Sequence, residues 1–111
     1  MYDVRHVLRK AGLRSTYSGY NYLASAVALV LKDQEFYLKN VTSNLYRVVG
    51  EQYGVSNVCV EAAIRTMINS YWNQNSNKIL SPLLGYPVFD KPTASEFISM
   101  LADYIQDHSS R

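Results

Sequence analysis

The sequence predicts an all-α domain of about six helices with a central helix-turn-helix. Apolar residues recur at intervals of three and four along most of the chain, which is the spacing of amphipathic helices. Runs of β-branched residues with a period of two, the pattern of strands, are hard to find. Only three prolines and five glycines interrupt the 111 residues. A chain of this length suits one domain around one hydrophobic core.

The composition narrows the class of protein. Hydrophobic residues make up 48% of the chain, so it should fold rather than stay disordered. The formal charge of +2 is compatible with DNA binding but does not argue for it. The one cysteine, Cys59, excludes an internal disulfide, and without a secretory signal it favours a reducing, cytoplasmic compartment. The longest apolar stretch, residues 22–31, is too short to span a bilayer, so we expect no membrane partner.

The N-terminal part predicts two helices and one ambiguous segment. Residues 4–11 should form a short helix closed by Gly12, and residues 19–31 a longer one. Residues 34–40 could add a helical turn. Positive charge gathers near the start, at Arg5, Arg9, Lys10 and Arg14. These basic residues are either a solvated helix face or phosphate contacts, and the sequence leaves both readings open.

Residues 41–73 predict two helices joined by a tight turn. Apolar residues between Val41 and Tyr53 fall on one face of the first helix. Gly54 then suits a left-handed C-terminal cap, and Ser56 or Asn57 suits the N-cap of the next helix. Such a turn between two helices is typical of the helix-turn-helix. An ordinary helical hairpin has the same capping residues between its helices, so DNA binding does not follow from spacing alone.

The second helix of this pair has an apolar and a polar face. The apolar face, which we expect to be buried, carries Val60, Ala63, Ile64, Met67, Ile68 and Tyr71. The opposite face carries Val58, Ala62, Arg65, Thr66 and Asn69, with Glu61 and Trp72 at its flank. In a helix-turn-helix, the N-terminal residues of this second helix contact base edges in the major groove.

The C-terminal part predicts a last helix behind an irregular stretch. Residues 78–84 could form a short helix, but Pro82 lacks a backbone donor, so a 3₁₀ turn or a helix starting near Ser81 fits equally well. Residues 74–77 should form a loop, and residues 85–91 an irregular, hairpin-like excursion. Thr93 and Glu96 match the capping box and should open a helix. Its buried face would carry Phe97, Ile98, Leu101, Ala102 and Ile105.

Several stretches of the chain together match one known family. They are Gly19-Tyr20-Asn21-Tyr22-Leu23, Thr42 to Tyr46, Val60-Glu61-Ala62-Ala63-Ile64-Arg65, Trp72, Leu84-Gly85-Tyr86, Lys91-Pro92-Thr93 and Ser95-Glu96-Phe97-Ile98. With these motifs in the same order over residues 7–105, the chain resembles the C-terminal effector domain of stage-zero sporulation protein A, a response regulator of endospore-forming Firmicutes.

The resemblance implies a fold and a function. It implies a six-helix domain with a helix-turn-helix that binds a short promoter box, often as a dimer on tandem sites, and regulates transcription in a two-component system. RNA polymerase would be a further partner. In this family a phosphoacceptor receiver domain precedes the effector domain, and we expect none within residues 1–111, which form a single domain. The resemblance implies no cofactor and no enzymatic activity.

Site residues carry over in part. The family reads bases with a Glu-Arg pair and a further Arg one turn later. Glu61 matches the acid and Arg65 the later Arg, but Ala62 replaces the middle Arg. Thr66 stands where a histidine is frequent, and Cys59 where a basic residue is common. The candidate DNA-binding set is therefore Asn57, Val58, Glu61, Ala62, Arg65, Thr66 and Asn69. Recognition of the usual box should be altered.

Two alternatives to this interpretation stay open. Glu61 and Arg65, four residues apart, could simply form an exposed ion pair that contributes about 0.3–0.5 kcal/mol to the helix. The loss of positive charge on the reading face also fits a family member that keeps the fold but acts through protein–protein contact. An enzyme is disfavoured, because His6 and His108 stand near opposite ends and no glycine-rich phosphate loop or metal-ligand cluster is present.

Overall fold

The computed structural model describes residues 3–74 and 77–109 and is all-α there, as predicted. The described residues contain seven α-helices, one π-helical segment and no strand. In chain order they are α1 (Val4–Lys10), α2 (Tyr20–Lys32), α3 (Gln34–Lys39), η1 (Val41–Tyr46), α4 (Arg47–Tyr53), α5 (Asn57–Asn73), α6 (Asn77–Leu84) and α7 (Ala94–Ser109). Within these ranges no helix combines the length and the hydropathy that crossing a bilayer requires.

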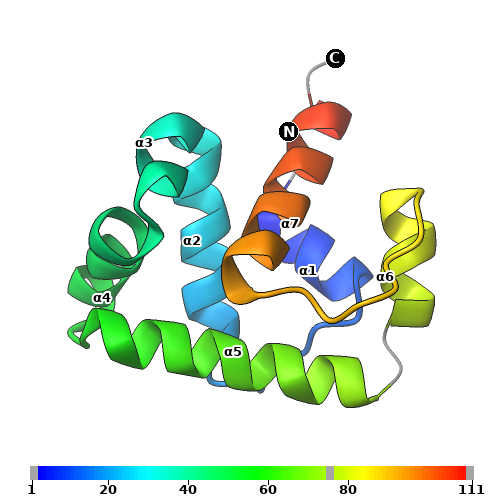
Figure 1. Ribbon diagram of the computed structural model, residues 1–111, viewed down its shortest axis with the longest axis horizontal. Coiled ribbons are helices and arrows are strands. Elements are labelled where there is room, and N and C mark those ends of the chain that lie inside the picture. Colours follow the sequence, from blue (N-terminus) through cyan, green and yellow to red (C-terminus); the bar gives the residue numbers. More distant parts are fainter. Residues whose placement is uncertain (1–2, 75–76, 110–111) are drawn as a thin grey trace.

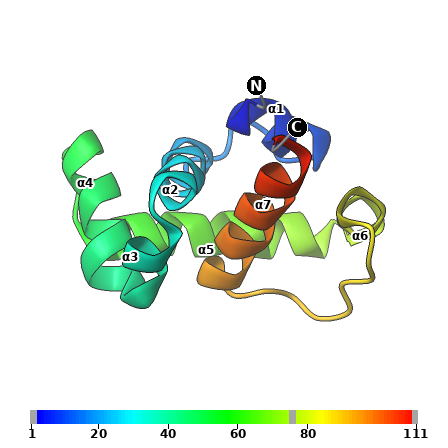
Figure 2. The same cartoon turned by 90° about the horizontal axis from the view of Figure 1, so that it is seen from above.

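The helices are arranged around α5, which runs along the base of the molecule in Figure 1. Helices α2 and α7 pack against each other and against α5. Helices α3 and α4 lie on one flank, and α6 lies on the other. Seen from above, α1 lies on one side of α5 and the connection between α6 and α7 lies on the other side (Figure 2). One face of α5 is therefore covered, and the face turned away from α2 and α7 is not.

The core lies where α2, α5 and α7 meet. It is built from large side chains that are almost completely buried, among them Tyr20, Leu23, Ile64, Ile68, Phe97 and Leu101. All five residues predicted for the inner face of the last helix are buried, and so are all of those predicted for α5 except Ala63, which is half-buried. These burial patterns confirm the helical faces that the spacing of apolar residues predicts.

The helix ends follow the capping signals in the sequence. Asp3 accepts from the backbone N–H of Arg5 at the start of α1, and Gly12 has a φ of 94° just after its end. At α7, Glu96 Oε1 accepts from the Thr93 N–H at 2.8 Å, while Thr93 Oγ1 accepts from the Glu96 N–H at 3.2 Å. The capping box is thus formed in both directions, as predicted.

Three segments differ from a simple helical interpretation. The ambiguous residues 34–40 contain a helix of their own, because Asp33 caps α3 by accepting from the Phe36 N–H. The helix expected over 41–53 is continuous, but its first part is π-helical. Side chains hold that wide turn: Asn40 accepts from the Ser43 N–H, and Arg47 Nε donates to the Ser43 carbonyl. The spacing of apolar residues does not predict such side-chain to backbone bonds, so the π-helical segment was not expected.

The third segment is α6, which continues through Pro82 instead of starting near Ser81. Pro82 lacks the N–H that would bond the Lys78 carbonyl, while Leu80 of the same helix is completely buried in the core. Asn77, expected in a loop, already belongs to α6, while residues 75–76 of that loop lie outside the described residues. Residues 85–91 are irregular, as expected, without the strand pairing of a hairpin.

Candidate nucleic-acid interface

The turn between α4 and α5 sets the direction of α5. Gly54 has a φ of 70° and ends α4 in the left-handed region, and Ser56 Oγ caps α5 by accepting from the Cys59 N–H at 3.1 Å. The Val55 N–H donates back to the Gly50 carbonyl at 2.9 Å. Both capping predictions are confirmed, and the bond from Val55 to Gly50 ties the turn before α5 to the backbone of α4.

Two glycines let α5 approach its neighbours closely. A Cβ at Gly50 would overlap the carbonyl oxygen of Val55, so the turn folds directly onto α4 at this position. A Cβ at Gly19 would overlap the carbonyl oxygen of Ala63, so the start of α2 rests on the backbone of α5. Sequence reasoning noted neither role. The only local signal was a glycine inside the apolar pattern of α4, which usually has a packing reason.

All seven candidate residues lie on α5, away from its buried face. Val58 is 69% exposed, and Arg65 and Thr66 are exposed as well. The other four, which are partly covered, are Asn57, Glu61, Ala62 and Asn69. Cys59 is exposed and free, and Trp72 is half-buried against the core. The outer face of α5 therefore brings the candidate residues together on one accessible surface.

The Glu61–Arg65 pair is present and loosely formed. Arg65 Nη1 lies 3.7 Å from Glu61 Oε1, and both side chains are about half exposed. In α4 the equivalent i,i+4 pair of Arg47 and Glu51 is closer, at 2.8 Å. An exposed pair at this separation contributes little to stability, so either side chain can exchange its partner for a ligand at small cost.

The pKa of Tyr46 is affected by the charged side chains along this edge of α5. Burial raises the pKa of Tyr46 to about 12, the nearby Glu61 carboxylate adds to that increase, and the Arg65 guanidinium opposes it. The charges of α5 therefore act on η1, and the same neighbourhood forms a small hollow of about 180 Å³ between Tyr46, Glu61 and the start of α7.

A larger hollow lies beside the same face of α5. It has a volume of about 340 Å³ and is lined by Glu61, Arg65 and Asn69 on one side and by residues 91–94 on the other. Lys91 Nζ donates to Asn69 Oδ1 at 2.6 Å across this hollow. Sequence reasoning missed Lys91 as a site residue, because nothing in a local pattern links two positions 22 residues apart.

Arg5, one of the basic residues near the N-terminus, lies on a different part of the surface. Arg5 Nη1 donates to Asn21 Oδ1 at 2.8 Å, and its guanidinium lies over the ring of Tyr20, 5.5 Å from the centroid. Helix α1 lies on the side of α5 opposite to the α6–α7 connection (Figure 2). Arg5 thus has an intramolecular role, as the solvated-face interpretation allows, and it is separate from the surface formed by Glu61, Arg65 and Lys91.

Comparison with known protein families shows the family to which the chain belongs. The family model described as "Sporulation initiation factor Spo0A C terminal" matches residues 4–105, which extend from α1 into the last turns of α7 and include the whole surface described above. This chain therefore belongs to the family of C-terminal, DNA-binding regulatory domains of sporulation initiation factors.

Proposed function

We propose that this domain binds double-stranded promoter DNA sequence-specifically, with α5 in the major groove, and thereby regulates transcription in sporulation. In this arrangement α4 crosses the DNA backbone while the N-terminal half of α5 approaches the base edges. The main support is the exposed outer face of α5, where Val58, Arg65 and Thr66 are accessible while the inner face is buried. The turn at Gly50 and Gly54 holds the two helices in a fixed relation.

Five of the seven candidate residues have a chemical role in this proposal. Glu61 accepts from a cytosine amino group, and Arg65 donates to a guanine edge or a phosphate. Asn57 and Thr66 contribute phosphate or base contacts at the rim. Ala62 offers only a methyl group, which can contact a thymine methyl but cannot read guanine. The domain therefore prefers a box that differs from the one its relatives with arginine at this position recognise.

For the assembly on DNA, we propose the arrangement that the resemblance suggests. Two copies bind adjacent tandem sites, and RNA polymerase is the second partner of the DNA-bound domain. Both interactions take place in the cytoplasm.

A titration of fluorescently labelled duplex DNA, followed by anisotropy at several salt concentrations, tests the proposal. If four phosphates are contacted, the logarithm of the association constant should fall against the logarithm of salt concentration with a slope of about −3.6. Arg65→Ala should lose about 1–3 kcal/mol of binding free energy and relax the preference at one base pair. Lys32→Ala is the matched control, because it removes the same charge at the far end of α2 (Figure 1).

One observation favours a second candidate function, contact with another protein. The first turns of the outer face of α5 carry Val58, which is 69% exposed, together with Cys59 and Ala62, and this part offers few donors to DNA. The same titration separates the two functions. An absence of binding at low salt, or equal losses in Arg65→Ala and Lys32→Ala, would favour the protein partner.

A further inference from the structure

The α6–α7 connection places a lysine at the surface of α5. Lys91 Nζ donates to Asn69 Oδ1 at 2.6 Å, which joins this connection to the C-terminal half of α5. Lys91 is exposed and Asn69 is half-buried. The ammonium group therefore lies beside the proposed DNA-facing surface although it comes from a different part of the chain.

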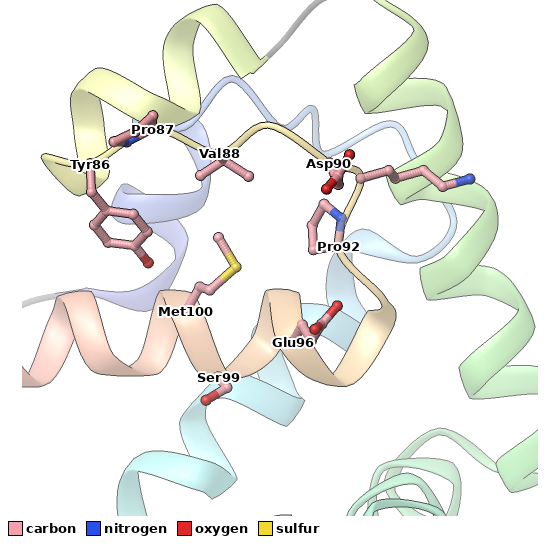
Figure 3. Close-up of a pocket in the computed structure, with 9 residues that line it drawn as sticks. Tyr86, Pro87, Val88, Asp90, Pro92, Glu96, Ser99 and Met100 are labelled. Atoms are coloured by element: carbon pink, nitrogen blue, oxygen red, sulfur yellow. The ribbon is translucent and has the colours of Figure 1, made fainter.

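The backbone on both sides of Lys91 is held in place. Pro92 is buried, and Thr93 belongs to the capping box of α7. Earlier in the connection, the Val88 N–H donates to Ser81 Oγ at 3.0 Å. Figure 3 shows Val88, Pro92 and Met100 around a hollow of about 440 Å³ under the connection. A residue that precedes a proline is also restricted to extended backbone, so Lys91 has little freedom except in its own side chain.

The charge of Lys91 is positioned without being neutralised. Its partner Asn69 is a neutral amide, and within residues 3–74 and 77–109 Lys91 forms no ion pair with a carboxylate. Arg65 lines the same hollow of about 340 Å³, so two cationic side chains from different elements border one depression. Glu61 is the acid in that hollow, and it is the partner of Arg65. This arrangement leaves the ammonium group available to an anion from outside.

We propose that Lys91 donates to a phosphate on the DNA strand that borders the groove occupied by α5, and that Asn69 is its positioning residue. This inference rests on the proposed DNA-binding function and extends the interface from one helix to a second element. A lysine is suited to this task because its compact charge contacts phosphate without reading sequence. Asn69 then contributes through Lys91 rather than by contacting a base itself.

The test compares Lys91→Gln with Lys32→Gln on two duplexes, one carrying the preferred box and one scrambled. Losing one phosphate contact should make the salt slope less steep by about 0.9, which corresponds to a roughly eightfold weaker affinity at 0.1 M salt. The loss should be similar on both duplexes, because a phosphate contact carries no sequence information. Lys91→Arg should keep the slope, and Lys32→Gln should leave it unchanged.

A second pair of variants tests the positioning role of Asn69. Asn69→Ala should weaken binding in the wild-type background but have no further effect when Lys91 is already Gln, because the two residues act as a unit. If wild type binds with a steep salt slope and Arg65→Ala weakens it, while Lys91→Gln keeps the wild-type slope, Lys91 is not a phosphate contact and only this inference fails. If wild type does not bind duplex DNA at all, the proposed function fails with it. Additive losses for Asn69 and Lys91 would remove the positioning role.

Discussion

At the scale of residues, Glu61, Ala62 and Arg65 determine what the outer face of α5 can read. The Glu61–Arg65 ion pair spans 3.7 Å between half-exposed groups, so its contribution to stability is small. Both side chains can therefore turn toward base edges without a large penalty. Ala62, between them, offers no hydrogen-bonding atom. The reading surface thus combines two side chains that can hydrogen-bond to bases, Glu61 and Arg65, with one silent position, Ala62, whose side chain cannot.

Installing an arginine at the silent position should restore readout of the family's box. Ala62→Arg should increase affinity for that box by about 1–3 kcal/mol, roughly five- to 150-fold, since this is the worth of one bidentate arginine–guanine contact. The stability of the domain should change little, because arginine is nearly as good a helix former as alanine. Anisotropy titrations of both proteins against the family box and a scrambled duplex give the measurement.

The matched control is Ala28→Arg, which adds the same charge to an exposed position of α2. Equal gains by Ala62→Arg on both duplexes, or an equal gain by Ala28→Arg, would mean that only charge was added. No gain on either duplex would contradict the docking of α5 in the groove.

At the scale of elements, the sequence predicted well the features that depend on neighbouring residues. The caps at Ser56 and at Thr93–Glu96 join atoms only three residues apart, so their signals are contained in short windows. The close approaches at Gly19 and Gly50 depend on which backbone lies opposite, which periodicity does not encode. The Lys91–Asn69 bond is missed for the same reason, since a candidate site drawn from one helix omits residues that another element supplies.

The two glycines around the α4–α5 turn should respond differently to substitution. Gly50→Ala should destabilise the domain by about 1–3 kcal/mol, because the added methyl overlaps the Val55 carbonyl and outweighs the helix propensity of alanine. Gly54→Ala meets no atom within 4 Å, but its φ of 70° costs an L-residue about 1–2 kcal/mol. Gly54→Asn should cost less, because asparagine tolerates the left-handed region.

Urea unfolding of the variants, combined with DNA titration, separates these causes. Gly50→Ala should also weaken DNA binding, because the turn must move away from α4 and α5 moves with it. Gly54→Asn should keep the affinity of wild type. A Gly50→Ala protein more stable than wild type, as expected for an ordinary exposed helix position, would show that the turn is not packed against α4 in solution.

At the scale of the whole molecule, a few long-range contacts close one core around α5. The Tyr71 hydroxyl on α5 donates to the carbonyl of Ala11, which lies 60 residues earlier in the chain. The ring of Tyr71 packs against that of Phe97 on α7, with 5.7 Å between the ring centroids. The sequence predicted that Tyr71 would be buried but not which partner its hydroxyl would find. The fold supplies this partner, because a buried phenol hydroxyl needs an acceptor and the Ala11 carbonyl, just after α1, lies within its reach.

Burial makes the stability of the domain sensitive to alkaline pH. It raises the pKa of Tyr71, and it raises the pKa of Tyr46 to about 12, with Glu61 adding to the effect and Arg65 opposing it. Both pKa values lie above the ordinary value of 10. The protonated phenols therefore stabilise the folded state below pH 10, and that stabilisation is lost as pH rises toward the folded-state values. We expect the free energy of unfolding, measured with urea, to fall steadily above pH 10.

Tyr71→Phe should separate the hydrogen bond of Tyr71 from its titration. At pH 7 the variant should be less stable by about 1–3 kcal/mol, because the buried Ala11 carbonyl loses its donor while the ring keeps its packing. Between pH 7 and pH 11 it should lose less stability than wild type, because phenylalanine has no proton to release.

Tyr86→Phe, at a side chain that is 49% exposed, serves as the control and should follow wild type at both pH values. Urea unfolding of the three proteins at both pH values provides the measurement. An identical loss between pH 7 and pH 11 in Tyr71→Phe and wild type would show that the fold does not raise the pKa of Tyr71, and the alkaline sensitivity would then rest on Tyr46 alone.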